Sequence, residues 1–224
     1  MAESKMTVVL DILSGLYQEG VYPGRSDQSG PPSWPRDPFH VLIATVLSQR
    51  TRDENTRRAA DQLFRSYPDL NSMAEAEATE LESLIRPAGF PRQKAKAIRE
   101  LCRHLRDESH GQVPADMDSL LQLPMVGRKT ANCVLAYGFG QDAICVDTHV
   151  HRICNLMGEV DTKTPDETEA ALRAQVPQER WRDINRYLVR HGQVVCLPGR
   201  ERCQECAVLS LCRHGLEGGA VARQ

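Results

Sequence analysis

The sequence predicts an all-α protein, and two observations carry this prediction. Apolar residues recur three and four positions apart in segment after segment, which is the spacing of one face of a helix. The valine and isoleucine runs fall inside that spacing, so no strand of length is expected. With 224 residues, the chain can form one large or two modest domains and bury a core.

The N-terminal part predicts two helices joined by a loop. Residues 6–18 place Val9, Ile12, Leu13 and Leu16 on one helix face. Residues 21–36 are rich in proline and glycine and predict a loop that crosses between units. Asp37 and Pro38 then supply an N-cap and a first-turn proline. The helix that follows should be deeply buried, because its apolar stripe is uninterrupted: Phe39, Leu42, Ile43, Val46 and Leu47.

Further helices are predicted along the middle of the chain. One covers residues 54–66, a second covers about 74–86, and a third follows the turn at 87–91 and continues to about Asp107. The first of these should bury Ala59, Ala60, Leu63 and Phe64.

A helix, a tight turn and another helix are predicted next. Asp116 caps a helix that ends near Gln122, and residues 123–127 form the turn before a helix at 128–137. Asp147 begins a helix at 148–157, and later helices occupy about 166–175 and 179–191. Residues 215–224 resemble a disordered tail.

The turn at residues 123–127 predicts a phosphate site. The N-terminus of a helix after an open turn offers backbone N–H groups to an anion, and Arg128 and Lys129 stand at that place. Taken alone, Lys129 is explained as a phosphate-binding lysine and Asp147 as an N-cap.

Four of the eight cysteines form a metal-binding pattern, Cys196-x6-Cys203-x2-Cys206-x5-Cys212. The other four are scattered and are expected to be small buried hydrophobes. Four neighbouring thiolates need a metal to offset their charge. Because there is a single C-x2-C pair, zinc and an iron–sulfur cluster both stay open on spacing alone.

These motifs together resemble the helix-hairpin-helix–GPD superfamily of DNA glycosylases. The endonuclease III branch has a pattern close to LPGVGRKTA followed by VDTH, and this chain has LPMVGRKTA followed by VDTH. Met125 stands where the family has the first glycine of the hairpin. The resemblance covers about residues 37–212, and the cysteine spacing matches the [4Fe–4S] loop of this branch.

The resemblance implies a two-domain fold, with a helical bundle domain and an iron–sulfur cluster domain. Residues 37–138 would form the bundle, with the helix-hairpin-helix at about 116–137. Residues 139–214 would form the cluster domain, together with the helix and crossover loop of residues 1–36. The DNA would lie in the cleft between the domains.

The resemblance also implies the chemistry. Lys129 would be the nucleophile and Asp147 its carboxylate partner in a DNA glycosylase with AP lyase activity. The enzyme would remove oxidised pyrimidines from duplex DNA through a lysine Schiff base and β-elimination. The cluster would be a [4Fe–4S] cluster bound by Cys196, Cys203, Cys206 and Cys212.

The alignment with the family pattern also implies which residues contact DNA. Gln49 or Arg50 would fill the gap left by an extruded base, although a helix end also explains them. Phe90 would be a wedge in the base stack, or else a core residue closing its turn. Phosphate contacts are expected from a further set of residues, some of which could equally be a solvated face: Arg92, Lys94, Lys96, Val126, Gly127, Arg128, Arg200 and Arg202.

The expected partner is double-stranded DNA with damaged bases or abasic sites. A net charge of −2 argues mildly against nucleic-acid binding, but segregated charge can still give a local basic face. The sequence holds no apolar run of transmembrane length and no secretory signal pattern, so no membrane contact and a cytoplasmic, monomeric protein are expected.

Three rival functions are considered. A monofunctional adenine or mismatch glycosylase of the same superfamily would normally lack a lysine at position 129. An 8-oxoguanine glycosylase would usually lack the four-cysteine loop. A non-catalytic, metal-stabilised DNA-binding protein would bind duplex DNA without forming a covalent adduct.

Overall fold

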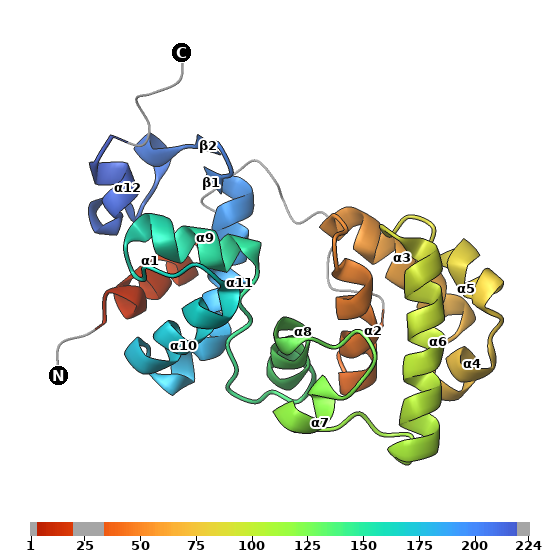
Figure 1. Ribbon diagram of the computed structural model, residues 1–224. Helices are drawn as coiled ribbons and strands as arrows, with labels where there is room; N and C mark the ends of the chain where they lie inside the picture. Colours follow the sequence, from red (N-terminus) through yellow and green to blue (C-terminus); the bar gives the residue numbers. More distant parts are fainter. Residues whose placement is uncertain (1–3, 20–33, 219–224) are drawn as a thin grey trace. The chain divides into compact units, whose positions relative to one another are not determined.

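The computed structural model describes residues 4–19 and 34–218, and Figure 1 shows it as a ribbon. The chain divides into two compact units. The terminal unit combines Met1–Gln28 with Asp142–Gln224, and the middle unit is Ser29–Gln141. The all-α prediction is confirmed, since the strands in the described ranges are one pair of two residues each. Most of the predicted loop at 21–36 lies outside the described residues.

The middle unit is built on the buried helix α2 (Pro38–Ser48). Its predicted cap is confirmed, because Asp37 Oδ1 accepts a hydrogen bond from His40 N at 3.0 Å. The apolar stripe of this helix is fully buried, with one exception: Phe39 is only half-buried. His40 takes the inner place instead, with its ring centroid 4.6 Å from that of Phe64.

Helix α2 packs against α3 (Asp53–Ser66), α6 (Pro91–Glu108) and α8 (Arg128–Cys133). The predicted inner face of α3 is confirmed as buried. Helix α8 therefore rests on the same helix, α2, that the segment after Ser48 follows.

The single helix predicted at 74–86 is wrong. Two short helices, α4 (Leu70–Glu75) and α5 (Ala78–Leu84), occupy this region and pack on α6. Asp69 and Ser72 form a capping box that begins α4 earlier than predicted. Ala76 is extended, with φ −60° and ψ 147°, and this residue ends the first helix.

The helix-hairpin-helix prediction is confirmed in its elements. Asp116 caps α7 (Met117–Leu121) and accepts a hydrogen bond from Ser119 N at 2.9 Å. After the turn, α8 continues into a wider π-helical turn, η1 (Val134–Gly138), where the predicted helix was regular. This turn packs on α2.

The terminal unit has its own core. The helices α1 (Lys5–Glu19), α9 (Thr148–Met157), α10 (Pro165–Gln175) and α11 (Trp181–Val194) surround it, with η2 (Gln178–Arg180) before α11. The stripe predicted on α9 is confirmed as buried: Val150, Ile153, Cys154 and Met157.

A compact C-terminal segment follows α11. It contains the hairpin β1 (Cys196–Leu197) and β2 (Arg200–Glu201), then η3 (Cys203–Glu205), η4 (Leu209–Leu211) and α12 (Arg213–Leu216). The predicted disordered tail is wrong at its start, because Gly215 and Leu216 belong to α12. Residues 219–224 of that tail lie outside the described residues. None of the helices in the described ranges has the length and apolar character to cross a membrane.

The close approach of η1 to α2 gives a prediction. A Cβ added at Gly138 would lie 2.8 Å from Pro38 Cα, a backbone atom that cannot move aside cheaply. We expect Gly138→Ala to lower the free energy of unfolding by about 1–3 kcal/mol in urea titrations. Gly127→Ala is the control in the same unit, because its Cβ would meet nothing within 4 Å. Equal losses in the two variants would contradict this packing argument.

Candidate active site and cysteine pocket

The hairpin turn presents its residues unequally. Met125 adopts a left-handed backbone, with φ 58°, and its side chain is 41% exposed. Gly127 and Arg128 are exposed, and Lys129 on the first turn of α8 is half-buried. The structure does not support the predicted DNA contact of Val126. Its side chain is buried, and its N–H donates a hydrogen bond to Leu123 O within the turn at 3.1 Å.

Asp147 is the N-cap of α9. Its Oδ1 accepts a hydrogen bond from Val150 N at 2.9 Å, so the capping interpretation is confirmed. The other carboxylate oxygen, Oδ2, accepts no hydrogen bond from the part of the chain that the structure describes. Asp147 belongs to the terminal unit, whereas Lys129 belongs to the middle unit.

Both predictions for Lys94 are wrong, because it neither contacts phosphate nor lies on a solvated face. Its side chain is 2% exposed, and its ammonium donates to Leu47 O in the last turn of α2 and to Gln49 O and Thr51 Oγ1 in the segment that follows. Burial lowers the pKa of Lys94 to about 8. The sequence did hold a signal, since Lys94 is in helical register with the buried stripe Ile98, Leu101 and Leu105.

Arg50 and Phe90, two of the residues predicted to enter the base stack, lie close together. Phe90 is 53% exposed, which excludes the alternative that it is a core residue. The Arg50 guanidinium lies 6.0 Å from the centroid of the Phe90 ring. Gln49 points to the hairpin instead, where its Nε2 donates to Met125 O at 3.0 Å and to Thr130 Oγ1 at 3.3 Å.

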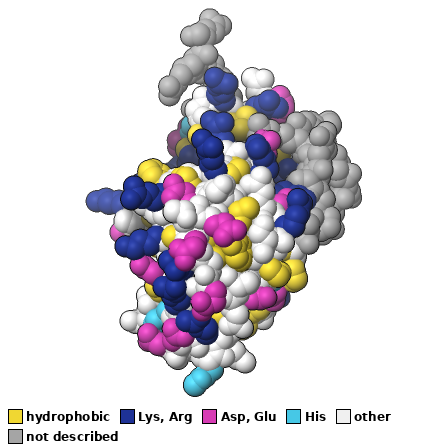
Figure 2. All heavy atoms as spheres, turned by 90° about the vertical axis from the view of Figure 1, so that its right-hand side faces the viewer, with side chains coloured by type: hydrophobic (Ala, Val, Ile, Leu, Met, Phe, Trp, Pro, Cys, Tyr) yellow, Lys and Arg dark blue, Asp and Glu magenta, His cyan; other side chains and the backbone are white. Residues whose placement is uncertain are grey.

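The other predicted phosphate contacts are on the surface. Arg92 and Arg200 are exposed. Lys96 pairs with Glu100 at 3.8 Å, and Arg202 pairs with Glu205 at 3.9 Å. Figure 2 shows a face on which lysine and arginine side chains are interspersed with aspartate and glutamate, so this face carries no single basic patch.

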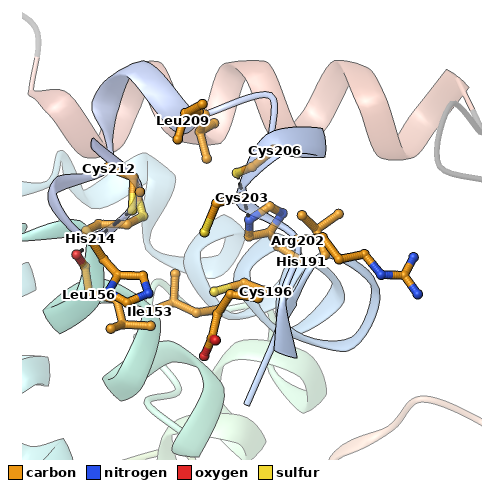
Figure 3. A pocket seen from close by; sticks show the side chains of 15 residues that line it. Ile153, Leu156, His191, Cys196, Arg202, Cys203, Cys206, Leu209, Cys212 and His214 are labelled. Atoms are coloured by element: carbon orange, nitrogen blue, oxygen red, sulfur yellow. Dashed lines mark hydrogen bonds between the residues drawn. The ribbon is translucent and has the colours of Figure 1, made fainter. Parts of the chain in front are cut away.

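The four predicted ligand cysteines line one pocket (Figure 3). Cys196 comes from β1, Cys203 begins η3, and Cys206 and Cys212 follow the two short helical turns. The remaining four cysteines are confirmed as buried. The rest of the pocket wall is largely apolar, with Ile153, Leu156, Val195, Val208 and Leu209 among its residues.

Polar groups missed by the sequence analysis support this pocket. Arg152 of α9 donates to Cys196 Sγ at 3.5 Å and also to Cys196 O, and it pairs with Glu201 at 3.5 Å. His191 of α11 places Nε2 3.6 Å from Cys206 Sγ, while its Nδ1 lies 3.0 Å from Tyr17 Oη. Their helical spacing alone gave no signal of this role.

The electrostatics of the pocket fit a bound cationic group. Burial raises the pKa of Cys206 to about 11, and it also raises the pKa of Cys196 and Cys203. Thiolates here therefore need positive charge at neutral pH. His214 Nε2 on the pocket wall is buried and has no hydrogen-bond partner among the described residues, which suits a further acceptor in the pocket.

Comparisons with known proteins agree with the motifs. Residues 43–178 match the sequence pattern of the HhH-GPD superfamily base excision DNA repair proteins. The endonuclease III of Thermotoga maritima is 49% identical over 176 residues, which cover 79% of this chain and 83% of that protein. The endonuclease III of Synechocystis is 40% identical over 176 residues, with 78% and 80% covered.

The fold agrees as well. A solved structure described as a trapped endonuclease III–DNA covalent intermediate superposes with a TM-score of 0.83 at 33% identity, over 96% of this chain and 99% of that chain. The chain therefore belongs to the HhH-GPD superfamily of base excision DNA repair proteins, and within it to the endonuclease III family.

Proposed function

We propose that this chain excises oxidised pyrimidines from duplex DNA, with Lys129 as the nucleophile and Asp147 as its carboxylate partner. As a member of the endonuclease III family, the chain is a base-excision DNA glycosylase with AP lyase activity. The observation that carries the residue assignment is the place of Lys129. It stands on the first turn of α8, directly after the hairpin, within the motif LPMVGRKTA.

The reaction needs a neutral amine. A damaged base must first leave the duplex, because its sugar carbon cannot be reached in the stack. The Lys129 amine then bonds to C1′ while the glycosidic bond breaks, and the base leaves with the electron pair and takes up a proton. Loss of the amine proton and opening of the sugar ring give an imine.

The imine makes the strand cleavage possible. It acidifies the C2′ hydrogen, and removal of that proton lets the C3′–O bond break, so that the 3′ phosphate leaves. Water then hydrolyses the imine and restores the lysine. No oxidant or reductant is required.

Asp147 has two oxygens for two tasks. Oδ1 caps α9, which fixes the carboxylate on a rigid helix start. Oδ2 then stabilises the positive charge that develops on the sugar and relays protons.

The surrounding residues would bind and distort the DNA. Phe90 is the proposed wedge, and Gln49 or Arg50 fills the vacated space. The phosphate contacts are proposed for the exposed residues of the earlier set: Arg92, Lys96, Gly127, Arg128, Arg200 and Arg202.

A [4Fe–4S] cluster is the proposed occupant of the cysteine pocket. The supporting observation is that the four cysteines line one pocket. A four-iron cluster takes one thiolate per iron, which matches a set of four cysteines. When bound, the cluster would crosslink the C-terminal segment through four iron–sulfur bonds.

The first prediction concerns Lys129. With an abasic site or an oxidised pyrimidine in duplex DNA, borohydride should reduce the imine and leave a stable protein–DNA adduct. Peptide mapping should place the adduct on Lys129, and Lys129→Gln should lose it while still binding the DNA. A monofunctional glycosylase or a passive binding protein leaves no adduct, so an untrapped wild type would overturn the proposal.

The second prediction separates the two tasks of Asp147. Asn caps helices about as well as Asp, so Asp147→Asn should change the free energy of unfolding by less than about 1 kcal/mol. Excision should fall by roughly 100-fold or more, because an amide cannot offset a cationic transition state. Asp147→Ala is the control that loses both the cap and the charge. Full excision by Asp147→Asn would reduce Asp147 to a capping residue.

The third prediction concerns the metal. Protein purified without oxygen should be yellow-brown and contain about four irons per chain, the content of one [4Fe–4S] cluster. Cys203→Ser should reduce this content, whereas Cys102→Ser, in a buried cysteine of the middle unit, should not. Stoichiometric zinc in such protein would refute the cluster.

A further inference from the structure

Three loop tips of the middle unit share an unusual backbone. Arg50, Phe90 and Met125 have φ values of 50°, 56° and 58°, in the left-handed region that side chains disfavour. Among the described non-glycine residues, His110 is the one other case of positive φ. All three tip residues are exposed. Such conformations cost free energy and persist where the surrounding structure fixes them.

One buried ammonium lies behind two of these tips. Lys94 Nζ donates to Leu47 O at 2.7 Å, to Gln49 O at 2.6 Å and to Thr51 Oγ1 at 2.8 Å. Thr51 Oγ1 also accepts a hydrogen bond from Gly89 N at 3.0 Å. The bonds therefore run from α6 to the loop that carries Arg50, and from that loop to the turn that carries Phe90.

Gln49 extends the connection to the third tip. Its carbonyl is held by Lys94, and its side-chain amide donates to Met125 O in the hairpin turn at 3.0 Å. The loop and the Phe90 turn also meet backbone to backbone, since a Cβ on Gly89 would lie 2.6 Å from Arg50 O. Neither segment can shift alone without breaking these contacts.

Lysine suits this place for a chemical reason. An ammonium has three N–H donors that diverge, and here three oxygens receive them. No donor is left for a phosphate, and the side chain is 2% exposed. Lys94 therefore acts within the protein and does not touch DNA.

We propose that Lys94 is a positioning residue for base extrusion, and that its ammonium holds the Arg50 loop, the Phe90 turn and the hairpin turn as one body. This inference rests on the proposed function, because it assumes that these tips enter the DNA. If the tips move independently, the wedge and the gap-filling residue reach the base stack out of register.

The test compares two substrates that differ in the need for extrusion. One is a duplex with a single oxidised pyrimidine, beside which 2-aminopurine reports the opening of the stack by its fluorescence. The other is a single-stranded oligonucleotide with an abasic site, which needs no wedge. The readouts are excision on the duplex and borohydride trapping on the single strand.

Lys94→Met removes the three donors and keeps the length of the side chain. We expect kcat/KM for duplex excision to fall roughly 10- to 100-fold, since small displacements of positioning groups cost this much. Trapping on the single strand should fall less than about threefold. The 2-aminopurine signal on binding should be lost with the duplex activity.

Arg103→Met is the matched control from the same helix. Its Nε donates to Ala74 O at 3.0 Å, a comparable bond to a backbone carbonyl that leads away from the three tips. It should leave the ratio of duplex to single-strand activity unchanged. Thr51→Val removes the joint between the loop and the Phe90 turn and should shift that ratio as Lys94→Met does, which decides the matter if Lys94→Met does not fold.

The outcomes separate the two proposals. If wild type neither excises nor forms an adduct, the proposed function fails. If wild type does both and neither Lys94→Met nor Thr51→Val shifts the ratio beyond that of Arg103→Met, Lys94 is a structural residue only and this inference is overturned.

Discussion

The middle unit depends on a charge where an apolar side chain would be expected. Lys94 occupies a core position of α6, and desolvating an ammonium is costly unless it is hydrogen-bonded. Two of its acceptors, Leu47 O and Gln49 O, lie at the C-terminal end of α2, where carbonyls lack helical partners and the helix end is negative. The hydrogen bonds to these carbonyls therefore offset the desolvation cost of the Lys94 ammonium, and they also give the carbonyls at the end of α2 their missing donors. The geometry of the following loop is a consequence.

In the terminal unit the buried groups are thiols, which would carry negative charge. Four thiols share a pocket in which burial raises the pKa of three of them, so negative charge is disfavoured there unless a cation is bound. Arg152 supplies part of this positive charge from α9, the helix that Asp147 caps. The helix that lines part of the pocket is therefore the helix that the carboxylate caps.

Periodicity and caps were sufficient for most helices, because those signals are local. Asp37, Asp116 and Asp147 all cap the helices predicted for them. Local signals failed where a tertiary contact decided the outcome. Lys94 was assigned to the surface by its charge, although its register matched the core, and its acceptors lie 43 to 47 positions earlier. The four-cysteine pocket was predictable because spacing alone defines it, whereas Arg152 and His191 became visible only once α9 and α11 were in place.

The turn of the helix-hairpin-helix holds a non-glycine residue in a left-handed backbone conformation. The family pattern has glycine where this chain has Met125, and a left-handed backbone costs a non-glycine residue roughly 1–2 kcal/mol. Met125 nevertheless keeps φ at 58°. Its carbonyl is bound by Gln49 Nε2, and Val126 N closes the turn on Leu123 O, so tertiary bonds hold a conformation that glycine would adopt freely. The turn leads directly into α8, and Lys129 lies on the first turn of that helix. Met125 therefore adds an exposed apolar side chain to the turn that precedes the proposed nucleophile.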